Sequence, residues 1–539
     1  MTVTETPSSA PPETTSDRDP ADDGTHRELR GLPAVLGTGD HKTVGRVWIG
    51  ASGLFLLLIA VAGVLLSVER ITVDELEVLG NDHVLQFFSL YRVGITFLVV
   101  LPLFIGLATA IVPLQVGAST IAFPRAAAAA LWTWGGGAVL LLLSYAIDGG
   151  VAATESLEPD AIALGLLGLG LVIAGLLLAS VCVVTTVIAL RPRHMSLLQV
   201  PPFAWSMLVA GVVWLLSLPV LMGGLLLAYL DLRYGQVLFG QPAELFSRLE
   251  WAFAQPQVYA MAIPVLGVVA EIVPVSAAAV QRHRGTVWAG IGGFGILAFG
   301  AWAQPRYYPD LLTEALYIGM AFAIGLPVLL VFGGMADSAR HNRPKLHPAF
   351  LLSMLGLLLL LVAVGAGAAA VVEPFHLLGT TWVVGQMNFV FTASLVAAVA
   401  AICWWAPKIW GRHVPSVLAI AAGLLVAGGG VVLAAAECVA GMLDEPANSF
   451  EGFDPRDGVD TFNLIAAIGS IVLAVGALVA VLALLRVIAG RRPAADAADP
   501  WGGQTLEWSA PSPPPTGNFP EPVPEVTSAT PLVAAEDEA

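Results

Sequence analysis

The chain has 539 residues, of which 57% are hydrophobic and only 12% are charged. Soluble domains carry about 25% charged residues, so this composition excludes an ordinary soluble protein and indicates a chain that lies mostly inside a membrane. The net charge of -16 sits mainly in the tails and certain loops, and it offers no basic surface for nucleic acid.

Long apolar stretches recur along the chain, each near the roughly 20 residues that cross a bilayer. We place them at 45–69, 85–116, 127–147, 162–190, 203–230, 252–279, 286–304, 314–335, 349–371, 381–406, 415–437 and 462–490. They predict an all-α bundle of twelve transmembrane helices over 45–490. A disordered tail at 1–44 and a Pro-rich, acidic tail at 491–539, expected to be disordered or extended, flank the bundle.

Loop charge predicts the orientation of these spans. Basic residues gather in alternate loops, at Arg125, Arg191, Arg282 and Arg340, whereas the opposite loops are acidic at 74–77, 155–160 and 444–460. Because cytoplasmic loops carry the excess of Lys and Arg, we expect both termini to be cytoplasmic.

Several motifs occur in an order that resembles subunit I of the haem-copper oxidases, the cytochrome c oxidase type of bacteria. They are GDHKTVG at 39–45, VPLQVGASTIAFPR at 112–125, WAFAQPQVY at 251–259 and DPWGGQTLEW at 499–508. The resemblance spans nearly the whole chain and agrees with the family's twelve helices. It implies a bacterial-type plasma membrane, other respiratory oxidase subunits as partners, and a family that carries two haems and one copper.

At the positions that match the family's metal-ligating histidines, this chain has other residues. Tyr91 and Asn388 stand for the low-spin haem ligands, Gln386 for the high-spin haem ligand, and Gln255, Gln304 and Pro305 for the copper ligands. Iron and copper favour imidazole nitrogen, an amide is a poor substitute, and proline has no side-chain donor. We therefore expect no haem, no copper and no catalytic residue.

The positions that carry protons in the family are also changed. The matches are Thr109, Thr120 and Gln257 and, by a looser alignment, Val328, none of which exchanges protons near neutral pH. The tyrosine that the family cross-links to a copper ligand is kept as Tyr259. We interpret it as structural, because its histidine partner is absent. The nine histidines of the chain are interpreted as surface or interfacial residues.

Acidic residues replace the family's two arginines that meet the haem propionates, at Asp444 and Glu445. Carboxylates there would repel propionates. We expect Arg92 or Arg306 to pair with Asp444 or Glu445 in a charge network, with snorkelling of Arg92 to the membrane surface as the alternative.

The space that two haems would fill requires other occupants, because protein interiors are close-packed. We expect the amides of the former metal site to bond to one another, and large aromatic side chains to fill the volume, with positions at the lipid interface as the alternative. The amides are Gln255, Gln257, Gln304, Gln386 and Asn388, and the aromatic candidates are Tyr91, Trp132, Trp134 and Trp382.

Three functions follow from these patterns. The first is a cofactor-free, non-catalytic paralogue that serves as a structural or regulatory subunit of a respiratory complex. The second is a transporter or channel that uses the vacated polar cavity. The third is a working terminal oxidase that reduces oxygen with electrons from cytochrome c and pumps protons, as family membership alone would imply. The sequence leaves open whether the chain is an enzyme.

Overall fold

The computed structural model describes residues 37–71, 79, 81–152, 158–236, 238, 245–300, 310–447, 457–490, 498–523, 526 and 528–536. The chain divides into two units, Met1–Thr38 and Gly39–Ala539, and the second contains all the described helices. Gln304, Pro305 and Arg306, three of the residues singled out in the sequence, lie outside the described residues.

Helices make up the second unit, and the described residues contain no strand. The longer ones are α2 (His41–Glu69), α3 (Asn81–Val93), the π-helical η1 (Gly94–Val100), α4 (Leu101–Gln115), α5 (Pro124–Ala146), α6 (Pro159–Ala189), α7 (Pro202–Tyr234), α9 (Ile263–Ser276), α10 (Arg284–Ala298), α11 (Leu311–Ala323), α12 (Gly325–His341), α13 (Pro348–Ala370), α14 (Thr381–Trp410), α15 (Ser416–Met442) and α16 (Val459–Ala489). Short helices are η2 (Leu197–Gln199), α8 (Leu245–Leu249), η4 (Glu250–Ala252), η5 (Gln257–Met261), η6 (Glu373–Phe375), η7 (Leu506–Ser509) and α17 (Pro531–Glu536).

Eleven helical segments of the described chain are long and apolar enough to cross a bilayer, which confirms the predicted all-α membrane bundle. α3, η1 and α4 form one of them, and α11 and α12 form another. The predicted span at 286–304 corresponds to α10, which has only 15 residues. Residues 301–309, which follow shortly after it, lie outside the described residues. At about 1.5 Å per residue, α10 falls short of the roughly 30 Å hydrocarbon core, so the count of twelve is not established.

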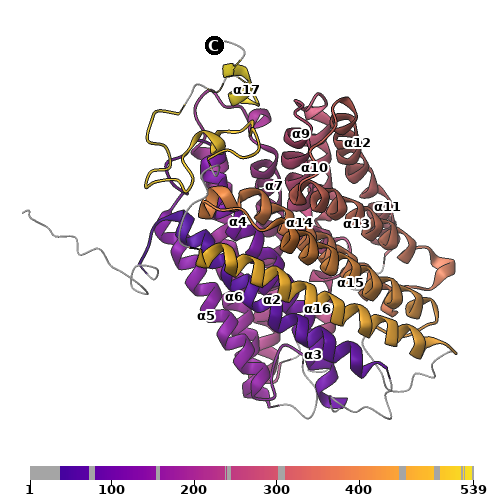
Figure 1. Cartoon of the computed structure of the whole chain (residues 1–539). Coiled ribbons are helices and arrows are strands. Elements are labelled where there is room, and N and C mark those ends of the chain that lie inside the picture. Colours follow the sequence, from indigo (N-terminus) through magenta and orange to yellow (C-terminus); the bar gives the residue numbers. More distant parts are fainter. Residues whose placement is uncertain are drawn as a thin grey trace, which may run out of the picture. The chain divides into compact units, whose positions relative to one another are not determined.

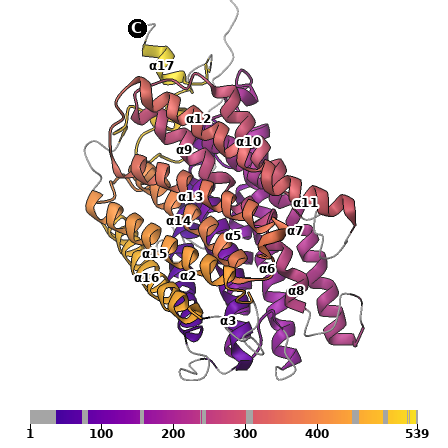
Figure 2. The same ribbon diagram turned by 90° about the vertical axis from the view of Figure 1, so that its right-hand side faces the viewer.

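The bundle has inner and outer helices. The most apolar stretch of the α3–η1–α4 span is 100% buried, whereas that of α16 is 28% buried. α2, α15 and α16 run side by side on one flank (Figures 1 and 2). Glycines allow the closest approach there, since a Cβ at Gly429 of α15 would lie 2.3 Å from the backbone nitrogen of Leu473 in α16.

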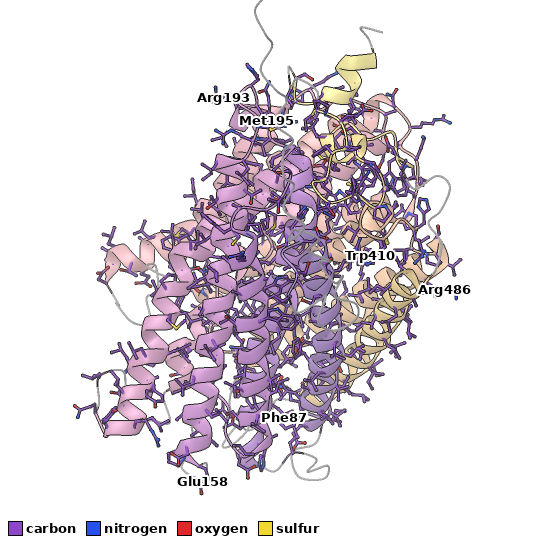
Figure 3. All side chains as sticks on the ribbon, turned by 90° about the vertical axis from the view of Figure 1, so that its left-hand side faces the viewer. Phe87, Glu158, Arg193, Met195, Trp410 and Arg486 are labelled. Atoms are coloured by element: carbon purple, nitrogen blue, oxygen red, sulfur yellow. The ribbon has the colours of Figure 1, made fainter. Side chains whose placement is uncertain are left out.

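The C-terminal segment 498–523 packs against one end of the bundle, which we call the tail end; the opposite end is the far end (Figure 1). The indole of Trp501 donates to the carbonyl of Trp404, and Lys408 donates to the carbonyl of Ala510. This segment is largely irregular, in keeping with an extended chain, but it is folded back onto the helices. Figure 3 places Arg193 toward the tail end and Glu158 at the far end, as the loop charges predict.

Candidate functional site

Tyr91, Asn388 and Glu437 form a buried chain of hydrogen bonds between α3, α14 and α15, which we call the Tyr91–Asn388–Glu437 chain. The Tyr91 hydroxyl donates to Oδ1 of Asn388 at 2.9 Å, and Nδ2 of Asn388 donates to Oε2 of Glu437 at 2.6 Å. Gly63 of α2 provides room for the ring, since a Cβ there would lie 2.8 Å from Cε2 of Tyr91. Tyr91, which we matched by sequence to a haem ligand, thus joins helices α3 and α14.

Little space surrounds this chain. Two small cavities border Tyr91 and Asn388, of about 30 Å³ and about 10 Å³. One water needs about 10–15 Å³ of such space, so the two together hold roughly three waters, whereas ligand pockets measure about 300–1,000 Å³. The slot between α2, α3 and α14 is therefore packed with protein.

Tyr91 and Asn388 do not fit a haem iron by residue type. An amide is a poor substitute for imidazole as an iron ligand. Here the Tyr91 hydroxyl donates to the Asn388 amide oxygen at 2.9 Å. The residues present therefore do not fit the low-spin haem that the resemblance implies.

Arg92 has a different partner from the one expected. Its Nη1 lies 2.9 Å from Oε1 of Glu250, and its guanidinium lies over the ring of Phe88, 4.1 Å from the centroid. The side chain is only 5% exposed, so it does not snorkel to the surface of the described unit. A buried cation needs a carboxylate nearby, and Glu250 at the start of η4 provides it.

Glu445 is buried with Arg70, at the end of α2. Oε2 of Glu445 lies 3.9 Å from Nη1 of Arg70, and Nδ2 of Asn463 donates to Oε1 of Glu445 at 3.0 Å. Asp444 is exposed, with a φ of 66°. The described pairs are therefore Arg92 with Glu250 and Arg70 with Glu445, and not Arg92 with Asp444 or Glu445 as expected. The pairing of Arg306 stays a prediction.

The described amides of the former metal site do not bond to one another. Asn388 bonds to Tyr91 and Glu437, and Gln257 accepts from the backbone N–H of Gly300 at 3.1 Å. Gln255 and Gln386 are 5% and 3% exposed, and neither amide bonds to another amide of the set. The expected mutual network is absent among these four described residues, because Asn388 and Gln257 bond to other groups. Gln304 and Pro305 lie outside the described residues.

The aromatic residues that we expected to fill the interior differ in their burial. Trp134 is buried, its indole donates to the carbonyl of Phe97 at 2.9 Å, and its ring lies 4.5 Å from that of Trp48. Trp132 is 40% exposed and fills no interior space, which leaves the alternative of a position at the lipid interface. Trp382 is half-buried and donates to the carbonyl of Ala366.

The positions of the family's proton groups are spread through the bundle. Thr109 and Val328 are buried and Thr120 is half-buried. The Tyr259 hydroxyl is fully buried and reaches the carbonyl of Ala363 at 3.4 Å. His41, expected at the surface, is 1% exposed, which corrects that expectation.

The tail end holds a second buried polar group that the sequence analysis missed. Glu507 of the C-terminal segment is fully buried and accepts from Nε2 of Gln115 at 3.0 Å. Thr505 donates to Glu271 of α9 at 3.0 Å. Burial raises the pKa of the Glu507 carboxyl above its ordinary range. A lone carboxylate inside an apolar span, such as Glu271 or Glu437, is a signal that could have found these groups from the sequence.

Comparison with known proteins identifies the family. Residues 43–472 match the family described as cytochrome c and quinol oxidase polypeptide I, so the chain belongs to that family. Over 528 residues it is 27% identical to cytochrome c oxidase subunit 1 of Bacillus subtilis, covering 92% of this chain and 82% of the relative. Over 507 residues it is 27% identical to cytochrome c oxidase subunit 1 of Corynebacterium glutamicum, covering 90% and 86%.

A solved structure shows the same fold. The chain of a haem-copper terminal oxidase dimer superposes with a TM-score of 0.68 and 16% identity, over 83% of this chain and 84% of that one. Together with the spans, these relatives make the chain a membrane protein of the bacterial plasma membrane, in a family whose members belong to multisubunit respiratory oxidase complexes.

The second candidate site is a cavity of about 850 Å³ toward the far end. Gln255 and Gln386, which the sequence analysis assigned to the positions of a copper ligand and the high-spin haem ligand, are part of its lining, and so is the Arg92–Glu250 pair. Its volume lies within the range of small-molecule sites. Amides and carboxylates in place of imidazoles and arginines do not fit an iron porphyrin with two propionates.

Proposed function

We propose that this chain is a cofactor-free, non-catalytic paralogue of the oxidase subunit, and that it serves as a structural or regulatory subunit of a respiratory complex. The Tyr91–Asn388–Glu437 chain carries the proposal. Tyr91 and Asn388, which we matched by sequence to the ligands of the low-spin haem, bond to each other between α3 and α14 at 2.9 Å. Two side chains that hydrogen-bond to each other between helices are unsuited to serve as iron ligands.

The tail end is the part of the molecule that we propose to meet other subunits, and both termini are proposed to be cytoplasmic. The motif at 499–508 is kept, and its packing is anchored by hydrogen bonds of Trp501, Lys408 and Glu507. The basic loops share this end by sequence pattern, which is the cytoplasmic side under the positive-inside rule.

Tyr259 allows a test that separates this proposal from a working oxidase. Tyr259→Phe removes a hydroxyl that the family uses in chemistry but that here lies 3.4 Å from the backbone carbonyl of Ala363 and near the amide of Gln386. We expect membranes of the variant strain to consume oxygen at the wild-type rate, whereas deletion of the chain lowers the rate or the yield of the complex. If Tyr259→Phe abolishes the oxygen consumption that depends on this chain, the tyrosine is catalytic and the proposal is wrong.

A transporter or channel is the second candidate, favoured by the cavity of about 850 Å³. Its lining runs from exposed residues at the far end to buried Gln255 and Gln386. Transport requires access from each side in turn, so proteoliposomes holding the chain alone would accumulate or exchange a solute. A subunit with a structural role would show no such flux.

A further inference from the structure

We propose that a crevice inside the bundle holds part of one acyl chain of an anionic phospholipid, whose phosphate is bound by Arg46 and Arg412. The inference goes beyond the proposed function, because it assigns a membrane ligand to the chain and not a role in a complex.

The crevice has a volume of about 50 Å³ and lies between α2, α4, α14, α15 and α16. We call it the Val399 crevice, after one of its lining residues. Every described residue of the lining is glycine, alanine, valine, leucine, isoleucine or cysteine, so the wall offers no strong side-chain partner to water. On α2 the lining runs from Ile49 to Leu56, about 10 Å at about 1.5 Å per residue, which is within the roughly 15 Å of one leaflet's hydrocarbon.

The side chains of α14 have free surface in this crevice. Residues 384–409 of α14 are buried except for Val399 and Ile402, which are half-buried and line the Val399 crevice. Val481 of α16 is also half-buried and also lines it. The innermost part of α14 therefore faces an apolar space inside the bundle.

Hydrocarbon suits this space better than water does. Water placed there would lose hydrogen bonds, and an unfilled apolar space destabilises the folded chain. In a bilayer the acyl chains are the surrounding solvent, and one of them enters the crevice without exposing apolar surface to water. One water needs about 10–15 Å³ of such space, so the crevice encloses a short length of a chain and not a whole lipid.

Two arginines lie at the tail-end edge of the Val399 crevice. Arg46 is three residues before the lining residue Ile49, on the same face of α2, and its Nε donates to the carbonyl of Ile409 at 3.1 Å. Nη1 of Arg412 donates to the carbonyl of Val487 at 2.8 Å. Because Ile409 and Arg412 are three residues apart, the two guanidiniums share one end of the crevice.

These cations select the headgroup. A guanidinium has five N–H donors in a planar fork that matches a phosphate, and both side chains are half-buried. Asp40 lies near Arg46 but is paired with Lys42 at 2.6 Å, so it does not cancel the two positive charges. Each basic residue near a membrane surface contributes about a fivefold preference for an anionic lipid.

Three probes test this assignment: dioleoylphosphatidylglycerol, dioleoylphosphatidylcholine and oleate. Binding to the purified full chain in detergent is measured by native mass spectrometry. We expect the phosphatidylglycerol to bind at least fivefold more tightly than the phosphatidylcholine. Equal binding of the two phospholipids would overturn the selection by charge, and oleate bound as tightly as the phosphatidylglycerol would overturn the assignment to a phospholipid.

Variants separate the headgroup from the acyl chain. Arg412→Gln should weaken the binding of phosphatidylglycerol about fivefold, whereas Arg193→Gln, at an exposed arginine, is the matched control and should leave it unchanged. Val399→Phe should weaken the binding of both phospholipids by filling the crevice, which keeps the test valid if Arg412→Gln fails to fold. Its control is Val212→Phe, at a side chain of α7 that is 40% exposed.

A phosphatidylglycerol with a photoreactive diazirine in one acyl chain locates the site. Illumination should attach the lipid within residues 395–403 of α14, and Val399→Phe should remove this product. Cross-links confined to outer helices such as α5, or a product at 395–403 that persists in Val399→Phe, would overturn the inference.

Discussion

Tyr91→Phe is the sharpest perturbation of the Tyr91–Asn388–Glu437 chain, because it removes one oxygen and keeps the ring. The hydroxyl donates to Oδ1 of Asn388 at 2.9 Å, and that acceptor is buried. A stranded buried group costs about 1–3 kcal/mol in soluble proteins. Interhelical hydrogen bonds in a membrane protein average about 0.6 kcal/mol, with a maximum near 1.7 kcal/mol. We therefore expect a loss of about 1–2 kcal/mol in the free energy of unfolding.

Unfolding by sodium dodecyl sulfate in mixed micelles measures this loss on the purified chain. Tyr234→Phe makes the same chemical change at a side chain that is 69% exposed, and it should stay within about 0.5 kcal/mol of wild type. Combining Tyr91→Phe with Asn388→Ala should show a coupling of at least about 0.5 kcal/mol, as contacting pairs do. A Tyr91→Phe variant as stable as wild type, or no coupling between the two sites, would refute the role we give to this hydrogen bond.

Three further outcomes follow from the same contacts. Glycine suits the φ of 69° at position 518, but Asn518→Gly loses the hydrogen bond to the ring of His41. The protection of the amide hydrogens of segment 498–523 against exchange should therefore fall by about 1–3 kcal/mol. Unchanged protection would contradict this role of Asn518. Burial raises the pKa of Glu507, so the protection of this segment should decline as the pH rises above the ordinary glutamic acid range. Glu507→Gln should make the decline smaller, and an unchanged slope would count against this role of Glu507. Glu250→Leu strands the buried Arg92 and should cost about 3–5 kcal/mol in detergent unfolding, whereas a neutral effect would mean that another group holds the cation.

The sequence predicted the bundle well because the bilayer fixes the length of each apolar stretch. It predicted less about charged partners. Arg92 and Glu250 are 158 residues apart, and their pairing depends on how η4 meets α3, which no local pattern encodes. The position of Arg92 in a span indicated that it needed a partner, but not which carboxylate would supply it.

Other differences have local physical causes. α10 has the composition of a span, but its helix ends at Ala298, so hydropathy alone overstated the length. His41 follows a polar stretch and precedes an apolar one, a pattern typical of an interfacial residue. The C-terminal segment buries it through Asn518, 477 positions away. The Pro-rich composition of that segment predicted an irregular backbone, while the packing of Trp501 and Trp508 against Trp404 could be found only in the structure.

Haem and metal content is the measurement that tests the central claim most directly. The chain would be purified from its own bacterial membrane, separated from other subunits, and assayed for pyridine haemochrome, iron and copper per polypeptide. The account predicts far less than one haem and one copper per chain, and a flat reduced-minus-oxidised spectrum. One or two haems per chain with a reversible redox band would contradict it.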